Sequence, residues 1–181
     1  MIQLDDKNIL ILECFRNVEH IDCFKVSIYD SYSYDNIYSD TYHLNNAVKD
    51  FKLFYNKGKY AYILYESINS GIFMDFYYLM SHFPVTIQKL NTSDLNIESS
   101  ITLTNEYIFP YDILYINNNE FILSSNNCFI FIDNKLDKHN YISDKYYDTL
   151  GIGNINKNTF YTYGIKRDEA VHVISIWNIK Y

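Results

Sequence analysis

Residues 112–133 read DILYINNNEFILSSNNCFIFID, and this stretch decides the expected fold. It contains three short apolar runs separated by two asparagine-rich turns. Apolar runs of this length, bounded by turn residues, are typical of neighbouring antiparallel strands. The stretch therefore predicts a three-stranded antiparallel meander.

The same order of runs and turns occurs elsewhere in the chain, at residues 1–30, 50–79 and 149–180. The segments between these copies, YSDTYHLNN, VTIQKLNTSDLNIESSITL and KHNYISDKYYD, each have the pattern of a fourth, outer strand. Four-stranded units that recur at intervals of about 40 residues or more are typical of β-propeller blades. We expect one β-rich domain over residues 1–181, with repeat units at 1–46, 47–108, 109–147 and 148–181.

The ends of the predicted third strands resemble the WD-repeat family, in which this strand commonly ends in Trp-Asp. The matching segments are VSIYD at 26–30, FIFID at 129–133 and ISIWN at 174–178, which contains Trp177. The resemblance implies an all-β, propeller-like array of about four blades, with the aromatic or apolar residue packed between blades. No Gly-His pair precedes any first strand, so the buried His–Asp network of that family is not carried over. Another all-β sandwich or barrel, or a mixed α+β fold, remains an alternative.

Closure of such a ring requires the first and last blades to meet. The last copy ends just after its third strand, at VHVISIWNIKY, and supplies no outer strand. An uncovered sheet edge promotes association. We therefore expect an array that is incomplete, or closed by a partner or by a second copy.

One segment has a competing interpretation. Leu44, Val48, Phe51 and Tyr55 recur at helical spacing within residues 43–55. The sequence leaves open whether these residues form a helix or a strand.

Composition excludes some classes of function. The chain is 48% hydrophobic and 20% charged, contains 20 Tyr, and has a net charge of −7. Since Arg occurs only at positions 16 and 167, nucleic acid is not expected as the main ligand. The N-terminus lacks the pattern of a signal peptide, and no apolar run is long enough to span a membrane. Cys14, Cys23 and Cys128 have no zinc-site spacing and are expected as buried thiols, which favours a cytoplasmic protein.

No motif indicates catalytic, cofactor-binding or metal-binding residues, and none is predicted. The five His are dispersed, and no phosphate-binding glycine loop occurs. Asp50, Asp112 and Asp148 each precede a predicted first strand. They would converge if a propeller held an enzymatic or ligand-binding site in its central channel, although turn capping explains them equally well.

The segment YDSYSYDNIYSDTYHL at residues 29–44 is unusually rich in tyrosine. Tyrosine supplies rigid, amphipathic contact area, which suits protein recognition. Partner-binding residues are therefore predicted at Tyr29, Tyr32, Tyr34, Tyr38 and Tyr42, and at Lys166 and Arg167 on an expected hairpin tip. The simpler alternative is an outer strand whose tyrosines merely cover the sheet.

These observations favour a non-enzymatic protein-interaction or scaffold module within a larger cytosolic complex. A protein partner would cover the open edge or the tyrosine-rich face. Two alternatives remain: a factor docked on a ribonucleoprotein assembly such as the ribosome, and a ligand-binding or enzymatic propeller.

Overall fold

The computed structural model describes residues 1–16, 21–55, 58–68, 84–103, 112–117, 120–124, 128–136, 138–143 and 147–179. Their regular secondary structure is entirely β-strand, which confirms the expected all-β class. The chain divides into an N-terminal unit, Met1–Asn105, and a C-terminal unit, Glu106–Tyr181. Within the described residues, no helix has the length and apolarity needed to cross a membrane.

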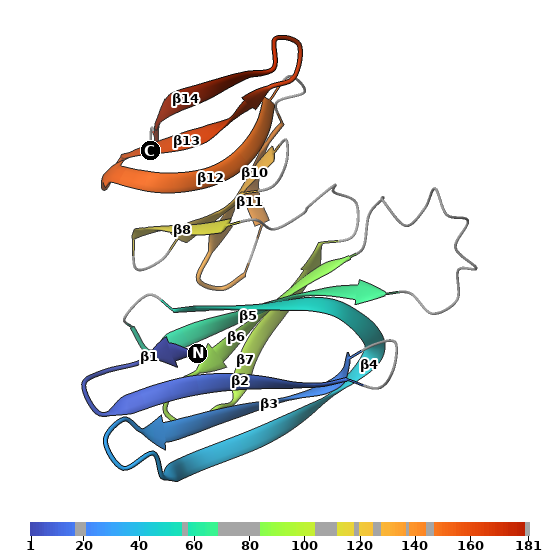
Figure 1. The fold of residues 1–181 in the computed structure, drawn as a ribbon, viewed down its shortest axis with the longest axis vertical. Coiled ribbons are helices and arrows are strands. Elements are labelled where there is room, and N and C mark those ends of the chain that lie inside the picture. The colour runs from blue at the N-terminus through green and yellow to red at the C-terminus, as the bar shows by residue number, and fades with distance from the viewer. Residues whose placement is uncertain are drawn as a thin grey trace. The chain divides into compact units, whose positions relative to one another are not determined.

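The N-terminal unit contains one seven-stranded antiparallel sheet, whose strands are neighbours in chain order (Figure 1). The strands are β1 (Ile2–Gln3), β2 (Asn8–Arg16), β3 (Ile21–Asp30), β4 (Asn36–Tyr55), β5 (Tyr60–Ile68), β6 (Val85–Asn91) and β7 (Ile97–Leu103). Each strand pairs with the next as in a continuous meander. The hairpins predicted in residues 1–30 are confirmed by the β1–β2 and β2–β3 pairings.

β4 is a single strand of 20 residues that includes the segment with helical spacing. Residues 36–43 and Val48 pair with β3, whereas residues 47–55 pair with β5. Register shifts interrupt both ladders around Val48, and the strand curves strongly in Figure 1. A helix over residues 43–55 is thus ruled out. The predicted boundary between the first two repeat units, at 46/47, lies inside this strand.

The bend in β4 brings the two halves of the sheet together over one apolar core. Leu10, Phe24 and Val26 from β2 and β3 share a buried cluster with Ile63 and Leu90 from β5 and β6. Tyrosine hydroxyls link the two halves as well. Tyr42 donates to the carbonyl oxygen of Leu95, and Tyr55 donates to that of Leu4 at 3.1 Å. Burial of this shared cluster is the main stabilising contribution in the unit.

The C-terminal unit contains two antiparallel sheets in its described residues. The first has the order β11-β10-β9-β8 and the second the order β12-β13-β14. Their strands are β8 (Asp112–Asn117), β9 (Glu120–Ser124), β10 (Cys128–Asp133), β11 (Lys138–Ser143), β12 (Tyr147–Asn156), β13 (Thr159–Lys166) and β14 (Val171–Asn178). The meander predicted for residues 112–133 is confirmed, and so is the outer strand predicted after it.

Trp177 packs between these two sheets. Its ring stacks on Phe160 of β13, with centroids 6.1 Å apart, and meets Phe129 of β10 edge-on at 5.4 Å. Its indole Nε1 donates to the hydroxyl of Thr162 at 3.0 Å.

The three cysteines, which were expected to be buried, differ in exposure. Cys128 is buried as expected, but Cys23 is half-buried and Cys14 is exposed.

The turns that follow β3 and β6 share one geometry, in which the amide of the positive-φ residue donates to the carbonyl oxygen four residues back, and the turn after β10 is a shorter variant in which it donates three residues back. Each begins with an Asp or Asn whose Oδ1 accepts a backbone hydrogen bond from two residues ahead: Asp30 from Tyr32, Asn91 from Ser93, and Asp133 from Lys135. Each also contains a residue with positive φ, namely Tyr34 at 60°, Leu95 at 57° and Leu136 at 66°. An Asx side chain that bonds ahead in this way favours a tight turn.

This turn geometry changes the assignment of the second repeat. The sequence placed its third strand in residues 71–79, which lie outside the described residues. In the structure, β6 is the strand that ends on an Asx turn, at Asn91. The segment expected to supply one outer strand, residues 85–103, instead forms the β6–β7 hairpin.

Candidate functional site

The predicted tyrosines divide into exposed and packed residues. Tyr32 and Tyr34 lie in the turn between β3 and β4 and are 75% and 73% exposed. Ile37 and Tyr38, at the start of β4, are also exposed. Tyr29 is half-buried, and Tyr42 stacks on Phe24 in the core at 5.0 Å. The exposed side chains of residues 32, 34, 37 and 38 are called the tyrosine tip.

Hydrogen bonds hold the backbone of the tyrosine tip. The carboxylate of Asp30 accepts from the amides of Tyr32 and Ser33, both at 2.9 Å. The amide of Tyr34 donates to the carbonyl oxygen of Asp30 at 3.0 Å. The bond from Ser33, followed by that from Tyr32, lowers the pKa of Asp30. The carboxylate therefore stays ionised, and the turn stays formed, in mildly acidic solution.

The turn between β1 and β2 supports the tip from the side. The amide of Ser31 donates to the carbonyl oxygen of Lys7 at 2.6 Å, and its hydroxyl donates to that of Asp6 at 2.9 Å. Next to this junction lies a hollow of about 370 Å³, lined by Met1, Gln3, Asp6, Ile9, Ser31 and Tyr32. The tip thus combines exposed aromatic rings with an adjoining concave surface.

The predicted basic residues form ion pairs within their own three-stranded sheet and its turns. Arg167 Nε donates to Asp148 Oδ1 at 2.9 Å, and this bond raises the pKa of the guanidinium. Lys166 forms an ion pair with Glu169, which raises the pKa of the ammonium. Both basic residues lie in the C-terminal unit, whereas the tyrosine tip lies in the N-terminal unit.

The three aspartates considered for a central channel do not form a described cluster. Asp148 binds Arg167, and the side chains of Asp50 and Asp112 lie outside those that the structure describes. Among described residues, no three His, Cys, Asp or Glu side chains gather as metal ligands would.

An apolar surface that the sequence did not indicate covers one face of the β12–β14 sheet. Ile174 and Ile176 of β14 are 72% and 66% exposed, and they pair across the ladder with Tyr163 and Tyr161 of β13. The two tyrosine rings lie over glycines of β12, since a Cβ at Gly153 would be 2.5 Å from the Tyr161 ring. No described strand pairs with the other edge of β14.

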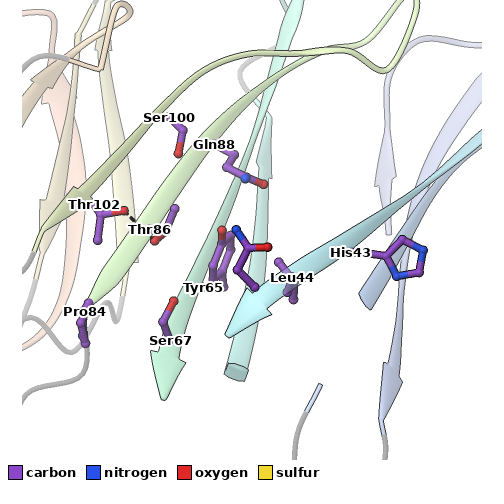
Figure 2. A pocket seen from close by; sticks show the side chains of 10 residues that line it. His43, Leu44, Tyr65, Ser67, Pro84, Thr86, Gln88, Ser100 and Thr102 are labelled. Atoms are coloured by element: carbon purple, nitrogen blue, oxygen red, sulfur yellow. Dashed lines mark hydrogen bonds between the residues drawn. The ribbon is translucent and has the colours of Figure 1, made fainter. Parts of the chain in front are cut away.

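A polar groove in the N-terminal unit was also missed (Figure 2). Its volume is about 430 Å³, and it is lined by His43, Leu44, Asn45, Tyr65, Ser67, Pro84, Thr86, Gln88, Ser100 and Thr102. The bend of β4 supplies one wall, and the sheet of β5, β6 and β7 supplies the floor. Along β5, the inward residues change from apolar Ala61 and Ile63 in the core to Tyr65 and Ser67 at the groove.

Strand register builds the floor of this groove. Tyr65 lies opposite Thr86, which lies opposite Thr102, so that their side chains form one row across three strands. Gln88 and Ser100 form the next row. The hydroxyls of Thr86 and Thr102 are 3.0 Å apart and hydrogen-bonded, as Figure 2 shows. Because the lining residues come from four strands, no contiguous motif could have indicated the groove.

A scan against protein-family models and a search of curated proteins both find no match to this chain.

Proposed function

We propose that this chain is a non-enzymatic protein-binding module that displays the tyrosine tip to a protein partner in the cytosol. The observation that carries the proposal is the conformation of Tyr34, which has a φ of 60° and yet is 73% exposed. A residue with a Cβ in the left-handed region costs about 1 kcal/mol, and Gly or Asn is the usual occupant.

Packing compensates for this cost in the equivalent turns. Leu95 and Leu136 hold the same backbone conformation, but their side chains are 0% and 3% exposed and so gain from burial. Among the described residues with a positive φ, Tyr34 lacks such burial, as does the exposed Ala170, whose φ is 52° but whose methyl group offers little contact area. Strained conformations that the fold itself does not need are typical of functional sites. Burial of the Tyr34 ring against a partner would supply the missing gain.

The surroundings of Tyr34 suit protein recognition. Tyr32, Ile37 and Tyr38 add exposed aromatic and aliphatic area, and the neighbouring hollow offers a concave surface. Aromatic residues on a fixed backbone lose little conformational entropy on binding, which makes them effective anchors at interfaces. This arrangement is the basis for proposing display as the mechanism.

We also propose that the chain is a propeller-like array of blade units related to WD repeats. The Asx turns after β3, β6 and β10 support this idea, since each follows the third strand of one of the first three units. The sheet of β8 to β11 supports it as well, because it has four antiparallel strands in chain order, as a blade does. The apolar outer face of β12–β14 would then suit contact with another blade or a partner.

The proposal is tested by cross-linking and affinity purification from the native organism. Wild-type chain is compared with Tyr34→Asn, which keeps the turn conformation but removes the ring, and with Phe15→Ser. The latter is a matched control, since Phe15 is an exposed aromatic residue of β2 outside the tyrosine tip. We expect one partner to be captured by the wild type and the control but lost from Tyr34→Asn.

Two results would contradict the proposal. Either Tyr34→Asn retains the partner at the wild-type level, or no protein is captured in stoichiometric amount. Nuclease treatment before capture distinguishes a protein partner from docking on a ribonucleoprotein assembly, since only the latter association requires intact RNA.

A further inference from the structure

We propose that the polar groove between β4 and the sheet of β5, β6 and β7 binds a neutral saccharide. This site is separate from the tyrosine tip and does not depend on the function proposed for it. The inference rests on the charge, the hydrogen-bonding groups, the size and the apolar contacts of the groove.

The described lining of the groove contains one side chain that can become positively charged, the imidazole of His43, and no permanently charged one. Among its described lining residues none is Asp, Glu, Lys or Arg, although charged residues make up 20% of the chain. An anionic or cationic ligand would leave its hydration shell here without gaining an opposite charge, which is unfavourable. The lining therefore selects for an uncharged ligand.

The floor offers hydrogen bonds in both directions. Hydroxyls of Thr86, Thr102 and Ser100 each donate and accept, and amide side chains such as that of Gln88 do the same with two different atoms. Saccharide hydroxyls have this same dual character. Burial raises the pKa of Tyr65, so that its hydroxyl remains protonated at neutral pH.

One acceptor in the floor has no donor among the described residues. Gln88 Oε1 is buried and makes no hydrogen bond with them. A buried acceptor without a partner is unfavourable, and rotation of the Gln88 amide toward the groove would let a ligand hydroxyl donate to it. Gln88 lies beside Ser100 in the same row, so one sugar ring can contact both side chains.

The size and the remaining walls agree with this ligand class. A volume of about 430 Å³ falls within the range of roughly 300–1,000 Å³ that is usual for small-molecule sites. Leu44 and Pro84 supply apolar contacts on either side of the polar floor. A sugar ring presents C–H groups on its faces and hydroxyls at its rim, which matches a polar floor between apolar edges.

The test uses saturation-transfer difference NMR on the full chain with three neutral trisaccharides: maltotriose, cellotriose and N-acetylated chitotriose. The matched charged probe is the deacetylated glucosamine trimer, which has the same ring skeleton but carries ammonium groups. We expect saturable binding of at least one neutral trisaccharide. Where N-acetylated chitotriose binds, its deacetylated form should bind at least about tenfold more weakly.

Two substitutions test whether the saccharide binds in the groove. Thr102→Val keeps the shape of an exposed side chain but removes its hydroxyl, and we expect about two- to tenfold weaker binding. Thr41→Val makes the same change at an exposed position of β4 outside the groove and should bind as the wild type does. The proposal is overturned if no neutral trisaccharide binds at millimolar concentration, if the charged trimer binds equally well, or if Thr102→Val and Thr41→Val behave alike.

Discussion

Replacing Thr162 by Val should destabilise the C-terminal unit through a single lost hydrogen bond. The Thr162 hydroxyl is fully buried and accepts from Trp177 Nε1 at 3.0 Å. Val has nearly the same shape, so packing around Phe160 is preserved while the indole donor loses its acceptor. A buried polar group without a partner costs about 1–3 kcal/mol. Because Trp177 is only partly buried, we expect about 1–2 kcal/mol.

The single tryptophan makes this loss directly measurable. Intrinsic fluorescence during urea unfolding reports on Trp177, and hence on the C-terminal unit. Each kcal/mol should also lower the melting temperature of a unit of this size by about 4–8 °C. Thr159→Val is the matched control, because the Thr159 hydroxyl donates to Asn178 at an exposed site on the same strand. It should cost less than about 0.5 kcal/mol.

A double-mutant cycle with Trp177→Phe, followed by circular dichroism, isolates the pair. The two substitutions should be less than additive by about 1 kcal/mol. The reasoning is refuted if Thr162→Val changes the unfolding free energy no more than Thr159→Val does, or if the cycle shows no coupling.

Further predictions concern the N-terminal unit. Hydrogen bonds lower the pKa of Asp30 below its usual 3.8, so its contribution to stability is present above pH 3.8 and is lost as the pH falls through the lowered value. Asp30→Asn keeps the acceptor and should show a smaller loss of stability in acid unfolding; an unchanged acid profile would contradict this. Burial raises the pKa of Tyr42 to about 12, so its contribution is complete below pH 10 and is lost as the pH rises through about 12. Tyr42→Phe should remove a tyrosinate that appears near pH 12 in ultraviolet titration, and a wild-type titration curve would show the assignment to be wrong. Tyr34→Asn should raise the unfolding free energy by about 0.5–1 kcal/mol, because Asn tolerates a positive φ; a fall in chemical denaturation would show that the ring stabilises the fold.

The hairpins could be predicted because the residues that specify each one lie close together in the sequence. In residues 112–133, apolar runs and Asn turns specify strands and connections within a few residues of one another, and the structure has them as expected. The same pattern of apolar runs and turns predicted the third and fourth repeat units, at 109–147 and 148–181. The tyrosine-rich composition of residues 29–44 predicted a recognition surface that includes Tyr32 and Tyr34, and both rings are exposed.

β4 shows why the spacing of apolar residues did not decide between helix and strand over residues 43–55. Register shifts between Ile21 and Cys23 on β3, and between Val48 and Phe51 on β4, break the simple alternation of side chains. The resulting spacing of Leu44, Val48 and Phe51 imitates a helix, although all three face one core. Pairing with β3 and β5, which no local window contains, decides the conformation.

The polar groove and the third strand of the second repeat were not predicted correctly, because both depend on the register between strands that are distant in the sequence. Nothing in VTIQKLN indicates that Thr86 lies beside both Tyr65 and Thr102. The turn after β6 was also not predicted from the sequence, because Leu95 occupies a left-handed position where Gly or Asn is usual. Its burial outweighs its backbone preference, and sequence patterns do not show such compensation.

The length of β4 has a consequence for synthesis of the protein. As the chain leaves the ribosome, residues 36–43 can pair with β3 at once, but residues 47–55 must wait for β5. Phe51 and Leu53 belong to the shared core and so remain solvated until the strand that covers them has been made. Nascent chains stalled within that interval should recruit chaperones, and those stalled after β6 should not.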